Sequence, residues 1–515
     1  MSNDNATSIA SLRAHRPWWL MLAASALSVS TALAAAEPDL SGYWLGDIGS
    51  KRERVVMGLE LQADINGRYD MKLDLPVSHL QALPLHGKAS IESDTLVHDG
   101  LHMSLRHNGE RLTGTLFGNG ESVSLERANR GHLPLPATPP KDLPTLPGPH
   151  WTTRLSGQIF ASPVIHDDIV YVGTTGGTFS AVNLADGNLR WSSAIGHPIL
   201  GAALVTDEAA FVVSDGGYLH RLERSTGREQ WRASIEDSRT SRELPHPQSS
   251  AWEWQAPRPL LVDGVLYVGG SDGCVQAFAA ATGASIWRTQ LPGRIQHGLS
   301  FVDGTLHVAT EPGELHALHA RSGRKAWTYP LSMRPGSAPV VHNGRVFIND
   351  RSGVLHAVDA RSGRALWLTQ FWTSWIESEP SFDNETLYIG ASDLRKITAI
   401  DTATGRVRWR TDVGGWSWGT PLVVNDHLIV GTAAGQPYFL QHVAGISVIR
   451  RDDGVLVSHY PLPPGRGFQW GIAGSITGDA QMLVAADIEG VLMGFELDAM
   501  IRNSSMSSIS TTHTP

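Results

Sequence analysis

The chain has 515 residues, 41% hydrophobic and 18% charged, so it is long enough for a large globular domain and a smaller one. Its formal charge of −9, without a long basic run, argues against nucleic acid as the main partner. Because Cys274 is its one cysteine, the chain forms neither an internal disulfide nor a cysteine-based zinc site.

The N-terminal residues 1–34 have the pattern of an export signal. Arg13 and Arg16 precede an apolar run that extends to Leu33, and Ala32-Leu33-Ala34 has the small-x-small pattern of a cleavage site. The run is too short and too rich in Ala and Ser for a good membrane span; the alternative is an uncleaved anchor. We therefore expect a periplasmic or secreted protein without a stable membrane span after cleavage.

Residues 38–128 form a first predicted unit. Short alternating stretches such as LELQADI, GRYDMKLDL and LTGTLF are separated by turn residues, including Asn66-Gly67 and Asn108-Gly109. This pattern predicts a small antiparallel β-barrel or sandwich domain. A proline-rich linker follows at 129–150, and the polar residues 499–515 are expected to be a disordered tail.

The large unit, 151–498, shows an internal repeat. Six segments, among them ALHARSGRKAW and AVDARSGRALW, each place a glycine four residues before a tryptophan. The tryptophans are Trp191, Trp231, Trp287, Trp327, Trp367 and Trp409. A period near 40 with four short strands per unit is typical of a β-propeller.

The number of copies predicts eight blades. A seventh copy, VIRRDDGVLVS, has Ser458 in the tryptophan position, and an eighth, ending at GVLMGFEL, lacks its outer strand. The segment HWTTRLSG, with Trp151, supplies the missing strand from the N-terminal end. Such a closure removes an open sheet edge. The fold class is therefore all-β: an eight-bladed propeller preceded by a small β-domain.

The repeat, with its A-x-(D/N)-x-x-(T/S/D)-G-x-x-x-W pattern, resembles the PQQ-type propeller repeat. That repeat occurs in quinoprotein alcohol dehydrogenases and in the BamB-type propeller of the outer-membrane assembly machine. The resemblance covers roughly residues 150–498 and implies the fold more than the function, because the motif residues build the blade.

The two relatives imply different functions. In the dehydrogenases, PQQ stacks on a tryptophan and against a disulfide between adjacent cysteines, and Glu, Asn and Asp side chains hold calcium; this chain lacks that disulfide. The BamB type is anchored by an N-terminal lipidated cysteine and lacks the extra β-domain, so this chain departs from it as well. We expect neither PQQ nor calcium to be required.

The loops that enter each innermost strand suggest a binding site near the central axis. The blades were aligned on a recurring proline, represented by Pro163, Pro259, Pro339, Pro380 and Pro421. Five residues upstream stand Gln158, Pro198, Trp254, Arg294, Arg334, Trp375 and Trp416, with Trp470 aligned loosely in the eighth blade. Three residues upstream stand Phe160, Leu200, Ala256, Gln296, Gly336, Glu377 and Trp418.

The candidate binding residues are Trp254, Arg294, Arg334, Trp375, Glu377, Trp416, Trp418 and Trp470. Aromatic faces beside Arg and Glu suit a peptide, a sugar or a planar cofactor. The alternative is that the rings pack against one another and plug the channel. The leading prediction is a monomeric, non-catalytic propeller that binds an envelope protein or peptide; the second is a quinone- or carbohydrate-binding propeller related to the dehydrogenases.

Overall fold

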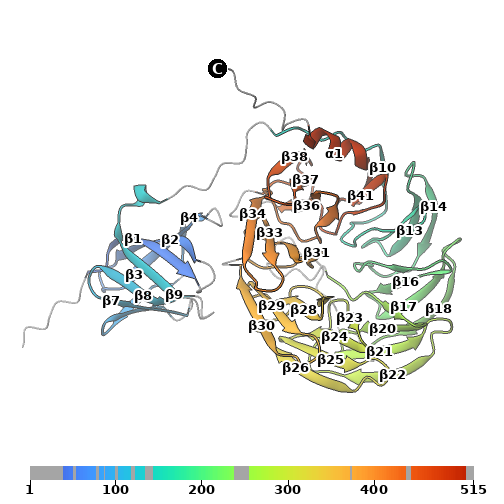
Figure 1. The fold of residues 1–515 in the computed structure, drawn as a ribbon, viewed down its shortest axis with the longest axis horizontal. Helices are drawn as coiled ribbons and strands as arrows, with labels where there is room; N and C mark the ends of the chain where they lie inside the picture. The colour runs from blue at the N-terminus through green and yellow to red at the C-terminus, as the bar shows by residue number, and fades with distance from the viewer. Residues whose placement is uncertain are drawn as a thin grey trace, which may run out of the picture. The chain divides into compact units, whose positions relative to one another are not determined.

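The computed structural model describes residues 39–49, 54–76, 80–85, 87–98, 102–116, 122–133, 143–236, 255–371, 374–435 and 442–505. The predicted export signal, residues 1–34, lies outside these ranges. Figure 1 shows two β-rich parts, which are described separately.

The first part is a nine-stranded antiparallel sheet with the order β4-β3-β2-β1-β9-β8-β7-β6-β5. Its strands are β1 (Gly42–Gly49), β2 (Arg54–Ala63), β3 (Tyr69–Leu75), β4 (Leu80–Pro84), β5 (Ser90–Glu92), β6 (Thr95–His98), β7 (Met103–His107), β8 (Arg111–Thr115) and β9 (Ser122–Ala128). Paired backbone hydrogen bonds join Tyr69 in β3, the second strand from one end of the sheet, to Ala89, which directly precedes the last strand, β5. The sheet therefore curls around a core that contains the fully buried Trp44, which corresponds to a barrel rather than a sandwich.

The second part consists of eight sheets arranged in a ring, which confirms the predicted propeller (Figure 1). Blades one and two contain β11 (Val164–His166), β12 (Ile169–Gly173), β13 (Thr178–Asn183), β14 (Leu189–Ala194), β15 (Leu204–Val205), β16 (Ala209–Ser214), β17 (Tyr218–Glu223) and β18 (Glu229–Ser234). Blades three and four contain β19 (Leu260–Val262), β20 (Val265–Gly269), β21 (Cys274–Ala279), β22 (Ser285–Gln290), β23 (Ser300–Val302), β24 (Thr305–Thr310), β25 (Glu314–His319) and β26 (Lys325–Pro330).

The remaining blades follow the same order from the axis outward, with one extra strand in blade seven. Blades five and six contain β27 (Val340–His342), β28 (Arg345–Asn349), β29 (Val354–Asp359), β30 (Ala365–Gln370), β31 (Ser381–Asp383), β32 (Thr386–Gly390), β33 (Lys396–Asp401) and β34 (Val407–Asp412). Blades seven and eight contain β35 (Leu422–Val424), β36 (His427–Gly435), β37 (Gly445–Arg450), β38 (Leu456–Pro461), β39 (Gln469–Gly471), β40 (Thr477–Gly478), β41 (Met482–Ala486), β42 (Val491–Glu496) and β10 (Trp151–Arg154). The antiparallel pairing of β10 with β42 confirms the predicted closure of the ring.

The glycine and tryptophan of the repeat hold neighbouring blades together. Trp327 in blade four donates from Nε1 to the backbone oxygen of Ala360 in the third turn of blade five, at 3.3 Å. Gly363 in the same turn has a φ of 72°, and a Cβ there would lie 2.7 Å from the Trp327 ring. Glycine is thus required both by the backbone conformation and by the close approach of the indole. The repeated motif couples each blade to the one before it.

Two predicted boundaries are corrected by the structure. In the predicted linker, Arg130–His132 form a short 3-10 helix, and the end of the linker belongs to the propeller: Thr145 pairs with His459, and Leu146 is buried. The predicted tail begins with a helix, α1 (Leu497–Ser505), whose Met500 is fully buried against blades seven and eight. Residues 506–515 lie outside the described ranges. Among the described residues, no helix has the length and hydrophobicity needed to cross a bilayer.

Candidate functional site

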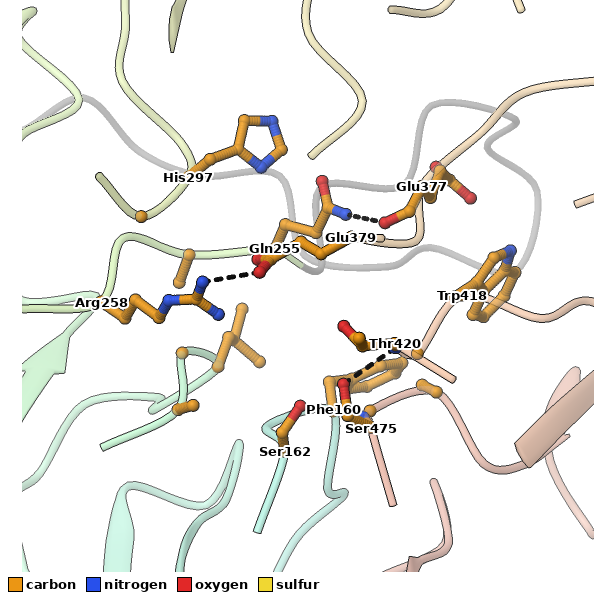
Figure 2. A pocket seen from close by; sticks show the side chains of 18 residues that line it. Phe160, Ser162, Gln255, Arg258, His297, Glu377, Glu379, Trp418, Thr420 and Ser475 are labelled. Carbon is orange, nitrogen blue, oxygen red and sulfur yellow. Dashed lines mark hydrogen bonds and ion pairs between the residues drawn. The ribbon is translucent and has the colours of Figure 1, made fainter. Parts of the chain in front are cut away.

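The loops that lead into the innermost strands, such as 331–339 and 413–421, lie on one face of the ring, here called the loop face. At its centre, these loops surround a cavity of about 80 Å³, here called the channel mouth (Figure 2). Its walls include Phe160, Ser162, Leu200, Gln255, Arg258, His297, Glu377, Glu379, Trp418, Thr420 and Ser475. Residues from blades one, two, three, four, six, seven and eight therefore meet at one point.

An ion pair spans the channel mouth. The guanidinium Nη2 of Arg258, in blade three, lies 2.6 Å from Oε2 of Glu379, in blade six (Figure 2). Gln255 adds a second crossing, because its side-chain amide donates to the backbone oxygens of Gly336 at 2.9 Å and Glu377 at 3.1 Å. These contacts join blades on different sides of the axis and narrow the channel.

Trp418 forms part of the wall, Trp416 stacks on it, and both are almost fully buried. Their ring centroids lie 5.1 Å apart with an interplanar angle of 12°, so the two rings stack on each other. Trp416 also donates to Asp393 Oδ1 at 2.9 Å and packs on His442. Trp418 belongs to a buried cluster with Phe160, Leu200, Ala473 and Ile488. The rings fill this side of the mouth and leave no slot between them.

Trp375 differs from the other described candidates, because 38% of its surface is exposed on the loop face. The guanidinium of Arg351 lies 4.4 Å from its ring centroid, at cation–π distance. Arg351 also forms an ion pair with Glu377 at 2.7 Å, and both of these charged side chains are buried. Burial raises the pKa of Glu377, and the positive charge of Arg351 opposes that shift. The exposed ring is therefore held in place by a buried charged pair.

Of the other predicted residues, Arg334 borders this group, because its backbone oxygen accepts a hydrogen bond from the Arg351 backbone nitrogen at 2.9 Å; the rest lie apart from it. Arg334 faces Glu311, with 3.7 Å between Nη1 and Oε1, and Arg294 lines a separate small depression with Glu236 and Ser271. Trp470 does not belong to the ring: it lies in β39 and packs in the core between blades seven and eight. In the eighth blade Gly471 and Ala473 take the two aligned positions instead. Trp254 lies outside the described residues.

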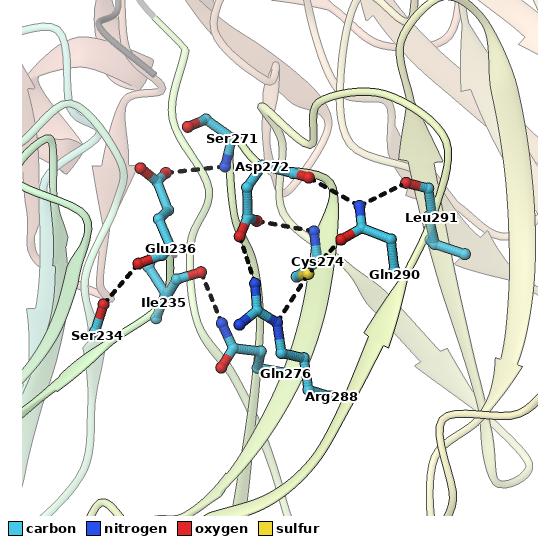
Figure 3. Close-up of polar contacts among 10 residues, drawn as sticks. All are labelled: Ser234, Ile235, Glu236, Ser271, Asp272, Cys274, Gln276, Arg288, Gln290 and Leu291. Atoms are coloured by element: carbon cyan, nitrogen blue, oxygen red, sulfur yellow. Dashed lines mark hydrogen bonds and ion pairs between the residues drawn. The ribbon is translucent and has the colours of Figure 1, made fainter. Parts of the chain in front are cut away.

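The sequence also has a long insertion, 232–253, between the tryptophan of blade two and the first strand of blade three, and the described residues on both sides of its middle part lie on the loop face. Glu236, the last described residue before that part, accepts a hydrogen bond from the backbone nitrogen of Ser271 at 2.9 Å (Figure 3). Gln255, the first described residue after it, enters the channel mouth. Nearby, Cys274 is buried and accepts a hydrogen bond from Arg288 Nε at 2.9 Å, so the one cysteine is built into the blade (Figure 3).

Sequence reasoning missed Arg258, Glu379 and Arg351. Arg258 and Glu379 each stand one residue before the aligned proline. Since that position also faces the axis, a comparison of its residues across the blades could have found both. Arg351 follows the second strand of blade five and has no counterpart in the aligned columns. Its role depends on contacts between loops that are far apart in sequence.

A planar quinone does not fit the described residues at the channel mouth. Sites for small organic ligands usually enclose about 300–1,000 Å³, whereas this cavity holds only a few water molecules. The two tryptophans that could sandwich a planar ring stack on each other instead.

The fold and the repeat define the class of protein: an eight-bladed propeller closed by its N-terminal strand and held by docking tryptophans. The family described as "Outer membrane protein assembly factor BamB" matches residues 146–277, 271–374 and 351–456. The chain belongs to this family.

Solved structures agree on the fold. BamB from Moraxella catarrhalis is 17% identical, with a TM-score of 0.51, over 71% of this chain and 98% of that one. The computationally designed Ika8 protein is 15% identical, with a TM-score of 0.54, over 68% and 100%. The quinohemoprotein alcohol dehydrogenase ADHIIG from Pseudomonas putida HK5 is 12% identical, with a TM-score of 0.52, over 68% and 76%. No curated protein matches the chain.

Proposed function

We propose that this protein is a non-catalytic scaffold of the bacterial cell envelope that binds a protein or an extended peptide on its loop face. The observation that carries the proposal is the contrast between Trp375, exposed and backed by Arg351, and a channel mouth that is closed by packed rings and an ion pair. Exposed tryptophans on a rigid support are frequent centres of protein interfaces.

Two further observations support this proposal. The family description names an outer membrane assembly factor, which acts on other proteins. On the same face, Met333 and Val443 are each 50% exposed, in loops of the fifth and seventh blades. The proposal includes export, a monomeric state and no required cofactor.

The test is the variant Trp375→Ala, compared with the wild type and with Ile286→Ala. Ile286 is 51% exposed on the outer strand of blade three, so it controls for the loss of any exposed apolar side chain. We expect Trp375→Ala to reduce the recovery of bound partners from an envelope extract at least about 10-fold, measured by quantitative mass spectrometry. Equal recovery of the same partners by all three proteins would contradict the proposal.

The quinone-binding alternative has a separate test. PQQ and Ca²⁺ are added to the purified protein while tryptophan fluorescence and the cofactor spectrum are recorded. We expect no change at micromolar PQQ, because the mouth lacks the volume for the ring system. Saturable quenching would instead support the dehydrogenase-like function.

A further inference from the structure

The outer strand of blade five, β30, combines an open sheet edge with two exposed leucines. It is the last strand in the sheet order β27-β28-β29-β30, at the rim of the ring (Figure 1). Leu366 is 44% exposed and Leu368 is 46% exposed. In the other tryptophan-bearing outer strands, the residue before the tryptophan is His150, Arg190, Gln230, Ile286, Ala326 or Arg408. The residue after it is Thr152, Ser192, Arg232, Arg288, Thr328 or Arg410. Blade five alone among these has leucine at both positions.

The two faces of β30 have different surroundings. Leu368 pairs with His356, whose Nδ1 lies 3.0 Å from the hydroxyl of Tyr329 in blade four, so Leu368 lies on the face turned to that blade. Trp367 and Thr369 lie on the opposite face, since their side chains donate to backbone oxygens in the third turn of blade six. An added strand would therefore meet an apolar face on one side and this turn on the other.

The turns around β30 are positively charged. The exposed cations are Arg321, Arg324 and Lys325 in blade four, Arg361 and Arg364 in blade five, and Arg406 in blade six. Arg406 follows Gly405, which packs on the Trp367 ring. The acids in the turns of blades five and six, Asp359 and Asp401, already accept hydrogen bonds from within their own blades. In a chain with a net charge of −9, this sector stands out as a basic surface.

We propose that β30 is a strand-pairing site for an extended acidic segment of another protein. The segment would add to the sheet edge by main-chain hydrogen bonds, with apolar side chains on Leu366 and Leu368 and carboxylates towards Arg406 and Arg364. This surface lies on the rim rather than the loop face, and the inference does not depend on Trp375. The inference can therefore be tested independently of the function proposed above.

A second copy of the chain is the competing occupant of an open edge. A twofold axis would pair two β30 strands antiparallel, so the turn with Arg361 and Arg364 in each copy would lie beside the end of the other copy's strand, at the uncharged Gln370. A second copy therefore leaves these basic turns unneutralised, whereas an acidic strand neutralises them. The charge around the edge favours the acidic partner.

The test uses a fluorescein-labelled synthetic peptide of alternating valine and glutamate and follows its anisotropy with the full chain. We expect saturable binding that weakens with salt. The double variant Leu366→Thr, Leu368→Thr should lower the affinity at least about 10-fold, while Ile286→Thr, in the same column of blade three and without arginine in its turn, should leave it unchanged. Equal affinity of the wild type and the leucine variant, or no binding by the wild type, would overturn the inference.

Two further arms separate strand pairing from simple attraction between charges. A peptide of the same sequence with N-methylated valines keeps the charge but loses main-chain donors, so it should bind at least about 10-fold more weakly; equal binding would overturn the pairing geometry. The variant Arg364→Glu, Arg406→Glu should lose the glutamate peptide and gain affinity for a valine–lysine peptide. If sedimentation shows a wild-type dimer that the leucine variant dissociates, the occupant is a second copy and the inference is wrong.

Discussion

The seams between the regular blades differ from the seam between blades seven and eight. At a regular seam, the repeat supplies both partners: Trp367 donates to the Thr402 backbone oxygen at 2.9 Å and lies against Gly405 of the next blade. In blade seven Ser458 replaces the tryptophan, and Leu146 and Met500, which lie outside the repeat, help to fill the core there. The motif thus holds neighbouring blades together at each regular seam, whereas segments outside the repeat fill the seam between blades seven and eight.

The largest expected effect is at a regular seam. Trp367→Ala removes a ring that is only 4% exposed, and it should lower the free energy of unfolding by about 3–5 kcal/mol. The measurement is urea unfolding followed by circular dichroism. A loss below about 1 kcal/mol would mean that the docking rings do not hold the blades together.

The sealing helix should contribute somewhat less. Met500→Ala empties a fully buried position in the core between blades seven and eight, and about 2–4 kcal/mol should be lost in the same assay. Ile501→Ala, at the partly buried neighbouring position, is the matched control and should cost less. If Met500→Ala is neutral, α1 does not seal this seam.

Asp350 and Asp487 follow the second strand of blades five and eight, and they predict a different dependence of stability on pH in the two blades. Burial would raise the pKa of Asp350 in blade five, but hydrogen bonds from His356 and Ser352 outweigh it, and the pKa is lowered. In blade eight Met493 takes the histidine position, and burial raises the pKa of Asp487 to about 6. Between about pH 4 and pH 6, the folded state therefore holds a proton on Asp487 that an unfolded chain, with an aspartate pKa of about 3.9, has lost.

The stability contributed by protonated Asp487 is thus lost as pH rises through about 6. Asp487→Asn should therefore stabilise the protein by about 1–2 kcal/mol at pH 8 and by about half as much at pH 5. Thermal unfolding at both pH values measures the difference. A gain that is the same at both would show that the carboxyl is not responsible.

The smallest effect is expected at Ser458, which is fully buried with a hydroxyl that has no hydrogen-bond partner. Ser458→Ala should change the free energy of unfolding by no more than about 0.5 kcal/mol, because no satisfied bond is lost. A loss comparable to that of Trp367→Ala would mean that the two seams depend on this column equally.

The sequence predicted the propeller well, because the glycine–tryptophan contact recurs at a fixed spacing and its chemistry is local to two turns. Alignment on the recurring proline placed Trp375 and Trp416 in the loops before the innermost strands, because that proline also keeps a fixed spacing. Trp470 was misplaced because the eighth blade lacks the proline that anchors the alignment. The Arg258–Glu379 pair links residues 121 positions apart, which no single repeat encodes. The helix at Met500 was missed because its apolar positions are few and flanked by polar residues.

The closure of the ring by β10 also fixes an order of events during synthesis. Arg154, at the end of β10, contacts Glu489, which is made 335 residues later. At about 5–20 residues per second, a ribosome needs roughly 20–70 s to bridge that interval. Throughout it, the first propeller strand has no partner, and the growing blades stand as an open row. The ring can close only after the residues of β42, the partner of β10, have been made.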